Sequence, residues 1–192
     1  MTSFSDTDYS SCPRIAVMGV GNILFTDEGI GIYVTEFLKQ NYQFSPVIDL
    51  IDGGTLGMNL IHYYQSYDHL LLLDTISVGD AKIPGEVYSL SSDVLQGMGQ
   101  YRQTAHEVEV LQTLELGVLV GDIAEVQIIA MVPQDIETVA FELTRPVRQN
   151  IALLINTVVQ HLKSLGVTVT PKASPATLDA IIEQFSQVSA SA

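Results

Sequence analysis

Basic residues and cysteine are both scarce in this sequence. It contains 8 Lys and Arg residues against 22 Asp and Glu residues, which gives a formal net charge of -14. Such a chain repels a phosphate backbone, and no Lys/Arg cluster offers a local exception, so we expect no nucleic-acid partner. Cys12 is the only cysteine, which excludes a disulfide within the chain and any cysteine-rich zinc or iron–sulfur site. A reducing compartment is compatible with this cysteine count.

Long apolar runs are also lacking. The longest, residues 70–73 and 151–159, are too short or too interrupted to cross a bilayer, which needs roughly 20 apolar residues. Residues 1–13 are polar and lack the basic and apolar regions of a signal peptide, so we expect a disordered leader there. These features predict a soluble protein with no membrane partner.

Short apolar runs are present, and they alternate with helical patterns. A stripe of apolar residues near the C-terminus predicts one long helix. This helix is expected to begin at Arg145-Pro146, because proline is tolerated in a first helical turn, and to end at Gly166. Strands that alternate with helices imply right-handed crossovers and a doubly wound sheet. The pattern therefore predicts an α/β three-layer sandwich with a twisted, mostly parallel sheet of about five strands flanked by helices. The predicted strands are residues 15–18, 47–51, 69–73, 86–90 and 126–132, and helices are predicted to start near Thr26, Met58, Thr104 and Arg145.

The length and composition indicate one domain. With 192 residues and 47% hydrophobic content, the chain can bury one substantial core. We expect residues 14–170 to form that core. Residues 171–192 carry a few spaced apolar side chains, which predict either a disordered tail or a short docking helix, with no assigned function.

Four acidic or imidazole residues each follow a predicted strand: Glu28, Asp52, Asp74 and His106. In an open parallel sheet such positions converge at the carboxyl ends of the strands, where ligands bind. His106 falls in the first turn of a predicted helix, where the dipole keeps its ring neutral and able to bind a metal. The set suits zinc, nickel or another borderline divalent cation.

Simpler explanations exist for each feature taken alone. Acids in a first helical turn, such as Asp27 and Glu28, are favoured by the helix dipole, and Asp52 before two glycines suits a turn. Gly19-x-Gly21 is part of a dinucleotide fingerprint, but its third position is Leu24 rather than Gly or Ala. Glycines that merely make a tight turn are the simpler interpretation. A small nucleotide-binding enzyme remains an alternative.

The same residues fall within motifs of a known family. These motifs are GVGNIL at residues 19–24, TDEGIG at 26–31, DGGT at 52–55, DHL at 68–70, DTI at 74–76, the histidine at His106, and LTRP at 143–146. With these motifs in the same order, the sequence resembles the maturation endopeptidases of nickel–iron hydrogenases from about Arg14 to Pro171.

The resemblance implies a cytoplasmic protease that removes a short C-terminal extension from the hydrogenase large-subunit precursor after nickel insertion. By motif, the family's nickel-sensing residues fall on Glu28, Asp74 and His106, and the nickel would arrive with the precursor. Asp52 would be a further catalytic or substrate-recognition residue. No Ser or Cys protease dyad is recognisable, so Asp52 is our candidate general base. A noncatalytic nickel-binding escort module is the main alternative, and nothing demands more than a monomer.

Overall fold

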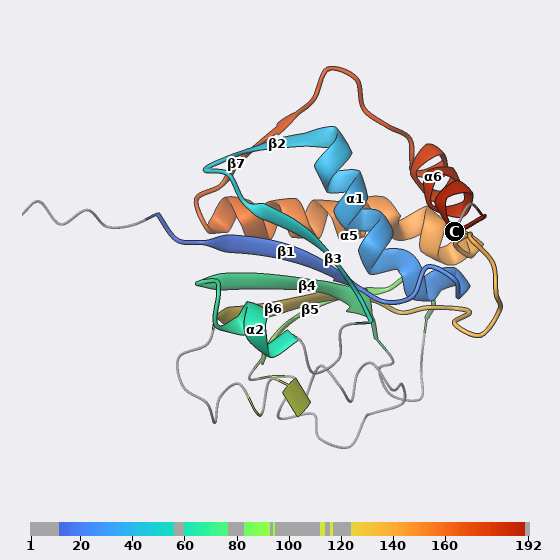
Figure 1. The fold of residues 1–192 in the computed structure, drawn as a ribbon, viewed down its shortest axis with the longest axis horizontal. Helices are drawn as coiled ribbons and strands as arrows, with labels where there is room; N and C mark the ends of the chain where they lie inside the picture. The colour runs from blue at the N-terminus through green and yellow to red at the C-terminus, as the bar shows by residue number, and fades with distance from the viewer. Residues whose placement is uncertain are drawn as a thin grey trace, which may run out of the picture.

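A five-stranded sheet organises the molecule (Figure 1). The computed structural model describes residues 12–55, 60–76, 83–92, 94, 112–113, 116 and 124–190. Four parallel strands are joined by one antiparallel edge strand, in the order β3-β1-β4-β6-β5. The prediction of a mostly parallel sheet of about five strands is thus confirmed. The strands are β1 (Ile15–Val20), β3 (Asp49–Gly54), β4 (His69–Thr75), β5 (Val87–Ser91) and β6 (Glu125–Met131).

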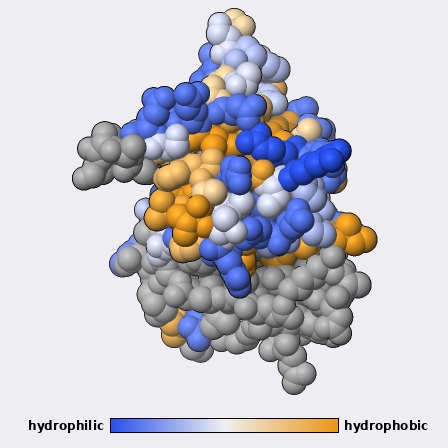
Figure 2. All heavy atoms as spheres, turned by 90° about the vertical axis from the view of Figure 1, so that its right-hand side faces the viewer, coloured by the Kyte–Doolittle hydropathy of each residue, from blue (hydrophilic) through white to orange (hydrophobic). Residues whose placement is uncertain are grey.

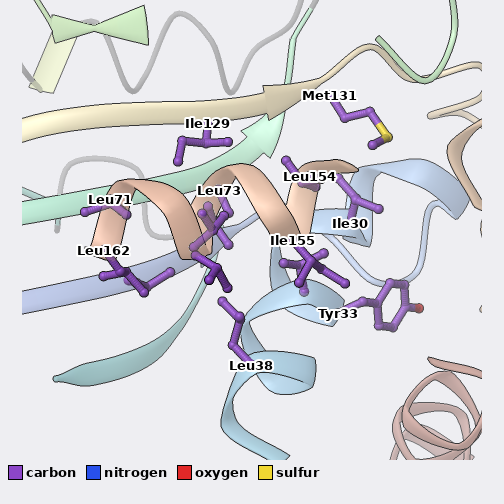
Figure 3. Packing of buried hydrophobic residues seen from close by; sticks show 14 of the residues in the cluster. Ile30, Tyr33, Leu38, Leu71, Leu73, Ile129, Met131, Leu154, Ile155 and Leu162 are labelled. Carbon is purple, nitrogen blue, oxygen red and sulfur yellow. The ribbon is translucent and has the colours of Figure 1, made fainter. Parts of the chain in front are cut away.

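Helices flank both faces of this sheet (Figure 1). On one face, α1 (Ile30–Asn41) and α5 (Arg145–Ser164) pack into a large apolar cluster with the strands. On the other, the short α2 (Leu60–Tyr64) closes a second cluster. Figure 3 shows residues of α1 and α5 gathered with Leu71 and Leu73 of β4.

The four consecutive leucines of β4 follow from its central place in the sheet. Successive side chains of a strand point to opposite faces. Leu71 and Leu73 accordingly enter the cluster under α1 and α5, while Leu70 and Leu72 enter the cluster on the α2 side. All four are at most 1% exposed, as a parallel strand covered on both faces requires.

Some elements differ from the sequence prediction. The strand expected at residues 47–51 begins at Asp49, because Val47 lies in the preceding turn and is 88% exposed. A separate two-stranded antiparallel sheet of β2 (Tyr42–Ser45) and β7 (Thr168–Pro171) was not predicted. The helix predicted from Thr104, and the leader up to residue 11, lie outside the described residues apart from isolated positions of the helix.

The C-terminal segment forms α6 (Leu178–Ala190), which resolves the two possibilities left open for it in favour of a helix. Ile181 and Ile182 are buried in the larger cluster, and the Phe185 ring meets the Tyr33 ring edge-on at 5.7 Å. This helix therefore packs on the same core as α1. In the described part of the chain, no helix combines the length and apolarity that a bilayer span requires.

Helix α1 lies unusually close to the sheet because glycines line the contact. A methyl group on Gly31 would lie 2.6 Å from the carbonyl oxygen of Val20 and still closer to that of Leu73. Neither backbone oxygen can move without disturbing the sheet. The backbone carbonyl of Gly31 occupies, in turn, the space that a side chain on Gly19 would need.

This contact makes Gly31→Ala destabilising, by about 1–3 kcal/mol, as expected for overpacking. Urea unfolding followed by circular dichroism measures the change. In an uncrowded helix the same substitution would instead stabilise by up to about 1 kcal/mol. A raised free energy of unfolding would therefore contradict the close contact.

Candidate functional site

The carboxyl ends of the parallel strands meet at one edge, beside the turn that joins β1 to α1. This turn contains a short 3-10 helix, η1 (Thr26–Gly29), which carries the half-buried Glu28. Both η1 and the first turn of α1 contact the end of β4, where Gly31 lies over the carbonyl of Leu73. Asp74 is the next residue of β4. Glu28 and Asp74 therefore come from two elements that touch at this edge.

Asp74 is a carboxylate at the rim of the core. It is 6% exposed, and one of its oxygens accepts a hydrogen bond from the Thr75 backbone N–H at 2.7 Å. A charged group so placed is retained only with polar partners. Alternation along β4 directs Asp74 to the same face as Leu70 and Leu72, the α2 side.

Asp52 lies on the other side of β1. It pairs with Gly19, is exposed, and accepts a hydrogen bond from the Gly54 N–H at 2.9 Å. Two strand spacings separate β3 from β4, roughly 10 Å. Leu50, two residues before Asp52, packs under α1, so Asp52 and Asp74 share an edge but point to opposite faces. The structure does not bring these two carboxylates together.

His106 lies outside the described residues. Among the residues that the structure describes, no three His, Cys, Asp or Glu side chains are grouped so that they could hold a metal ion. Glu28, Asp52 and Asp74 alone therefore do not constitute such a group. The predicted set of Glu28, Asp74 and His106 remains a prediction that depends on His106.

Asp27 has a role that the sequence analysis missed. Its side chain is fully buried, with 0% exposure. It accepts hydrogen bonds from the backbone N–H groups of Gln134 at 2.9 Å, Asp135 at 3.1 Å and Thr144 at 2.7 Å, and from the Thr144 hydroxyl at 2.8 Å. The sequence suggested an acid that favours the start of its own helix. The carboxylate instead ties η1 to the loop after β6 and to the start of α5.

Thr26, the residue before Asp27, has a backbone conformation that β-branched residues rarely adopt, with φ of 33°. Its N–H donates to the Ala140 carbonyl at 3.2 Å and its hydroxyl to the Thr138 carbonyl at 2.6 Å. Strain of this kind persists where surrounding contacts impose it, and it clusters at functional sites. The turn that carries Glu28 is therefore held firmly.

Tyr33 supports the same turn from α1. Its hydroxyl donates to the carbonyl of Ile23 at 3.3 Å. Burial raises the pKa of Tyr33 to about 12, an effect that Arg148 partly offsets. The hydroxyl therefore remains a proton donor at neutral pH.

The glycines of the β1 turn have a structural explanation. Gly21 has φ of 134°, and a side chain there would collide with the carbonyl oxygen of Glu28. The Asn22 N–H donates to that same oxygen at 3.3 Å. A tight turn thus accounts for Gly21 without a nucleotide, in agreement with the simpler interpretation of the Gly19-x-Gly21 pattern.

A surface cavity of about 480 Å³ lies where β5 begins, against α5. Gly85 is packed there against Pro146 and Asn150 of α5. None of Glu28, Asp52 and Asp74 lines the cavity. Its walls are formed by Ile83, Pro84, Gly85, Glu86, Val87, Tyr88, Asn150 and Leu153.

Comparison with known proteins gives consistent matches. The family model described as hydrogenase maturation protease matches residues 32–161. Protein HydD of Wolinella succinogenes is 37% identical over 142 residues, which cover 72% of this chain and 89% of that protein. Hydrogenase 2 maturation protease of Escherichia coli is 30% identical over 160 residues, 83% of this chain and 96% of that one.

The fold has close counterparts among solved structures. The hydrogenase maturating endopeptidase HybD from Escherichia coli superposes with a TM-score of 0.75 at 30% identity, over 83% of this chain and 98% of that chain. The maturation protease HybD from Thermococcus kodakarensis, at 21% identity and a TM-score of 0.62, shares the fold.

Proposed function

The chain belongs to the hydrogenase maturation protease family, and on that premise we propose that it removes the C-terminal extension of a nickel–iron hydrogenase large-subunit precursor once nickel has been inserted. The observation that carries the proposal is the family match over residues 32–161 together with the fold it shares with maturation endopeptidases. The partner is then the precursor, and the nickel is part of the substrate.

In this proposal Glu28, Asp74 and His106 complete the coordination of the precursor's nickel. Carboxylates and imidazole are suitable ligands for a borderline divalent cation. The contact between η1 and the end of β4 supports a joint role for Glu28 and Asp74. The strained, hydrogen-bonded turn supports it further, since a ligand on a rigid element is already positioned when the substrate arrives.

Asp52 acts as the general base in the same proposal. It is exposed and thus able to meet a water molecule, whose proton it would accept as the water attacks the scissile carbonyl. The same proton would then pass to the departing amine as the peptide C–N bond breaks, which leaves a new carboxylate on the large subunit. Because Asp52 and Asp74 lie on opposite sides of β1, a precursor held at Asp74 has to cross the end of β1 to reach Asp52. The nickel-binding site and the site of peptide-bond cleavage are therefore separate on the enzyme.

The intact mass of a cognate precursor, incubated with the enzyme before and after nickel loading, tests the proposal. We expect loss of a C-terminal peptide from the nickel-loaded form alone. Glu28→Gln, Asp74→Asn and His106→Ala should each slow the cleavage by at least about tenfold, the scale of damage to a metal site. Glu183→Gln, an exposed change on α6, is the matched control and should cleave normally.

Two results would contradict the proposal. Full processing by folded Glu28→Gln and His106→Ala variants would remove the nickel-sensing role. Binding of a verified cognate precursor without any change in its mass would point to an escort module instead.

A further inference from the structure

Two loops are joined beside Glu28 into one rigid unit, which we call the paired loops (residues 22–25 and 134–142). The Ala140 N–H donates to the Leu24 carbonyl at 3.0 Å, and Phe25 forms bridges with Val139 and Ala140. Below this contact, the Asp27 N–H donates to the Asp135 carbonyl at 3.0 Å. The paired loops are thus connected directly to the turn that bears Glu28.

The second of the paired loops is also braced internally. Asp135 accepts hydrogen bonds from the backbone N–H groups of Glu137 at 2.9 Å and Thr138 at 3.0 Å. Hydrogen bonds from Thr138 and Glu137 lower the pKa of Asp135, so the bracing carboxylate stays ionised at neutral pH. Together with the bonds to Asp27, these contacts leave the loop little freedom.

The paired loops present apolar side chains to solvent. Leu24 is 42% exposed and Val139 is 70% exposed. Figure 2 faces the side of the molecule on which η1 and α6 lie, and it shows apolar surface gathered beside hydrophilic surface there. The exposed parts of these two side chains contribute no burial energy to the fold itself. Apolar surface that a fold leaves exposed beside a candidate site is a feature of interaction sites.

We infer that the paired loops, through Leu24 and Val139, are a docking surface for an apolar segment of the large-subunit precursor adjoining its nickel site. This inference rests on the proposed function. The occupant follows from continuity: only three residues separate Leu24 from Glu28, so a precursor whose nickel reaches Glu28 also covers the paired loops. A surface already held in its binding geometry loses little entropy when the partner arrives.

The test is steady-state processing of the nickel-loaded precursor by the full chain carrying both Leu24→Ser and Val139→Ser. Each substitution removes apolar contact in the complex, so the KM should rise at least about tenfold for the pair, with kcat changed less than twofold. Val47→Ser is the matched control, because Val47 is 88% exposed in the turn before β3, at the amino end of the sheet. Its KM should stay at the wild-type value.

Circular dichroism and the melting temperature verify that the double variant is folded, and the Kd for the precursor is measured in parallel. If the wild type cleaves and the double variant keeps both its KM and its Kd, the docking surface is refuted while the proposed function stands. If the wild-type enzyme does not cleave the precursor, the proposed function fails. In that case, a double variant whose Kd for the precursor equals that of the wild type would refute the docking surface as well. A change of oligomeric state with an unchanged Kd would assign the surface to a second copy of this chain and likewise overturn the inference.

Discussion

Replacing Asp27 with alanine is expected to lower the free energy of unfolding by about 3–5 kcal/mol, the scale for breaking a buried charged network. The substitution empties a buried side-chain position and leaves three partly buried backbone N–H groups, those of Gln134, Asp135 and Thr144, without their acceptor. A donor left unsatisfied costs up to about 1–3 kcal/mol, the upper end applying to full burial. The loop after β6 and the start of α5 would then lose their shared anchor to η1.

Urea unfolding followed by circular dichroism measures this effect, and two further variants calibrate it. Thr144→Val removes only the hydroxyl that donates to Asp27 and should cost about 1 kcal/mol. Asp27→Asn keeps the shape but turns one acceptor oxygen into a donor that faces a backbone N–H, so its cost should lie between the other two. A loss below about 1 kcal/mol for Asp27→Ala would show that water replaces the carboxylate and that the network is not what joins these segments.

Replacing Asp52 with asparagine is expected to lower kcat for processing by about 10²–10⁴-fold, the usual contribution of a general base. Stability should be nearly unchanged. Asp52 is exposed, and the asparagine oxygen can still accept the hydrogen bond from the Gly54 N–H. Single-turnover cleavage of the nickel-loaded precursor, with urea unfolding of the same samples, separates the two effects.

Asp49→Asn is the matched control for Asp52. Asp49 is an exposed carboxylate on the same strand, and its hydrogen-bond partner is the Tyr67 hydroxyl at 2.8 Å. Its variant should process the precursor normally. A raised KM with unchanged kcat in Asp52→Asn would make Asp52 a substrate-recognition residue. Unchanged kinetics would leave Asp52 with only a structural role in the turn, where it accepts the hydrogen bond from the Gly54 N–H.

Features of the fold that depend on residues close together in the sequence could be predicted, and features that depend on distant residues could not. The four consecutive leucines of β4 indicate a strand buried on both faces, and this pattern can be recognised without knowing which strands and helices pack against it. Gly166 after α5 has φ of 85°, and its N–H donates to the carbonyl of Lys163, as its place after the apolar stripe predicted. Family motifs then indicated the endopeptidase class, which the comparisons confirm.

Other features had no local signal. The β2–β7 sheet pairs residues 42–45 with residues 168–171, and neither strand has an apolar pattern long enough to reveal itself. The tail at residues 178–190 was ambiguous until Ile181 and Ile182 met the core beside α1. Both depend on a partner more than a hundred residues away.

The sequence by itself determined the succession of the five main-sheet strands and of helices α1, α2 and α5. It also determined the shared edge where Glu28, Asp52 and Asp74 follow their strands, and the family, since periodicity, turn residues and motifs are local properties of the chain. Only the tertiary structure decided that Asp52 and Asp74 face opposite sides of the sheet, because that follows from how β3 and β4 register against β1. It also decided that Asp27 anchors a loop 107 to 117 residues away, because a buried carboxylate is stabilised by whichever donors the fold brings to it.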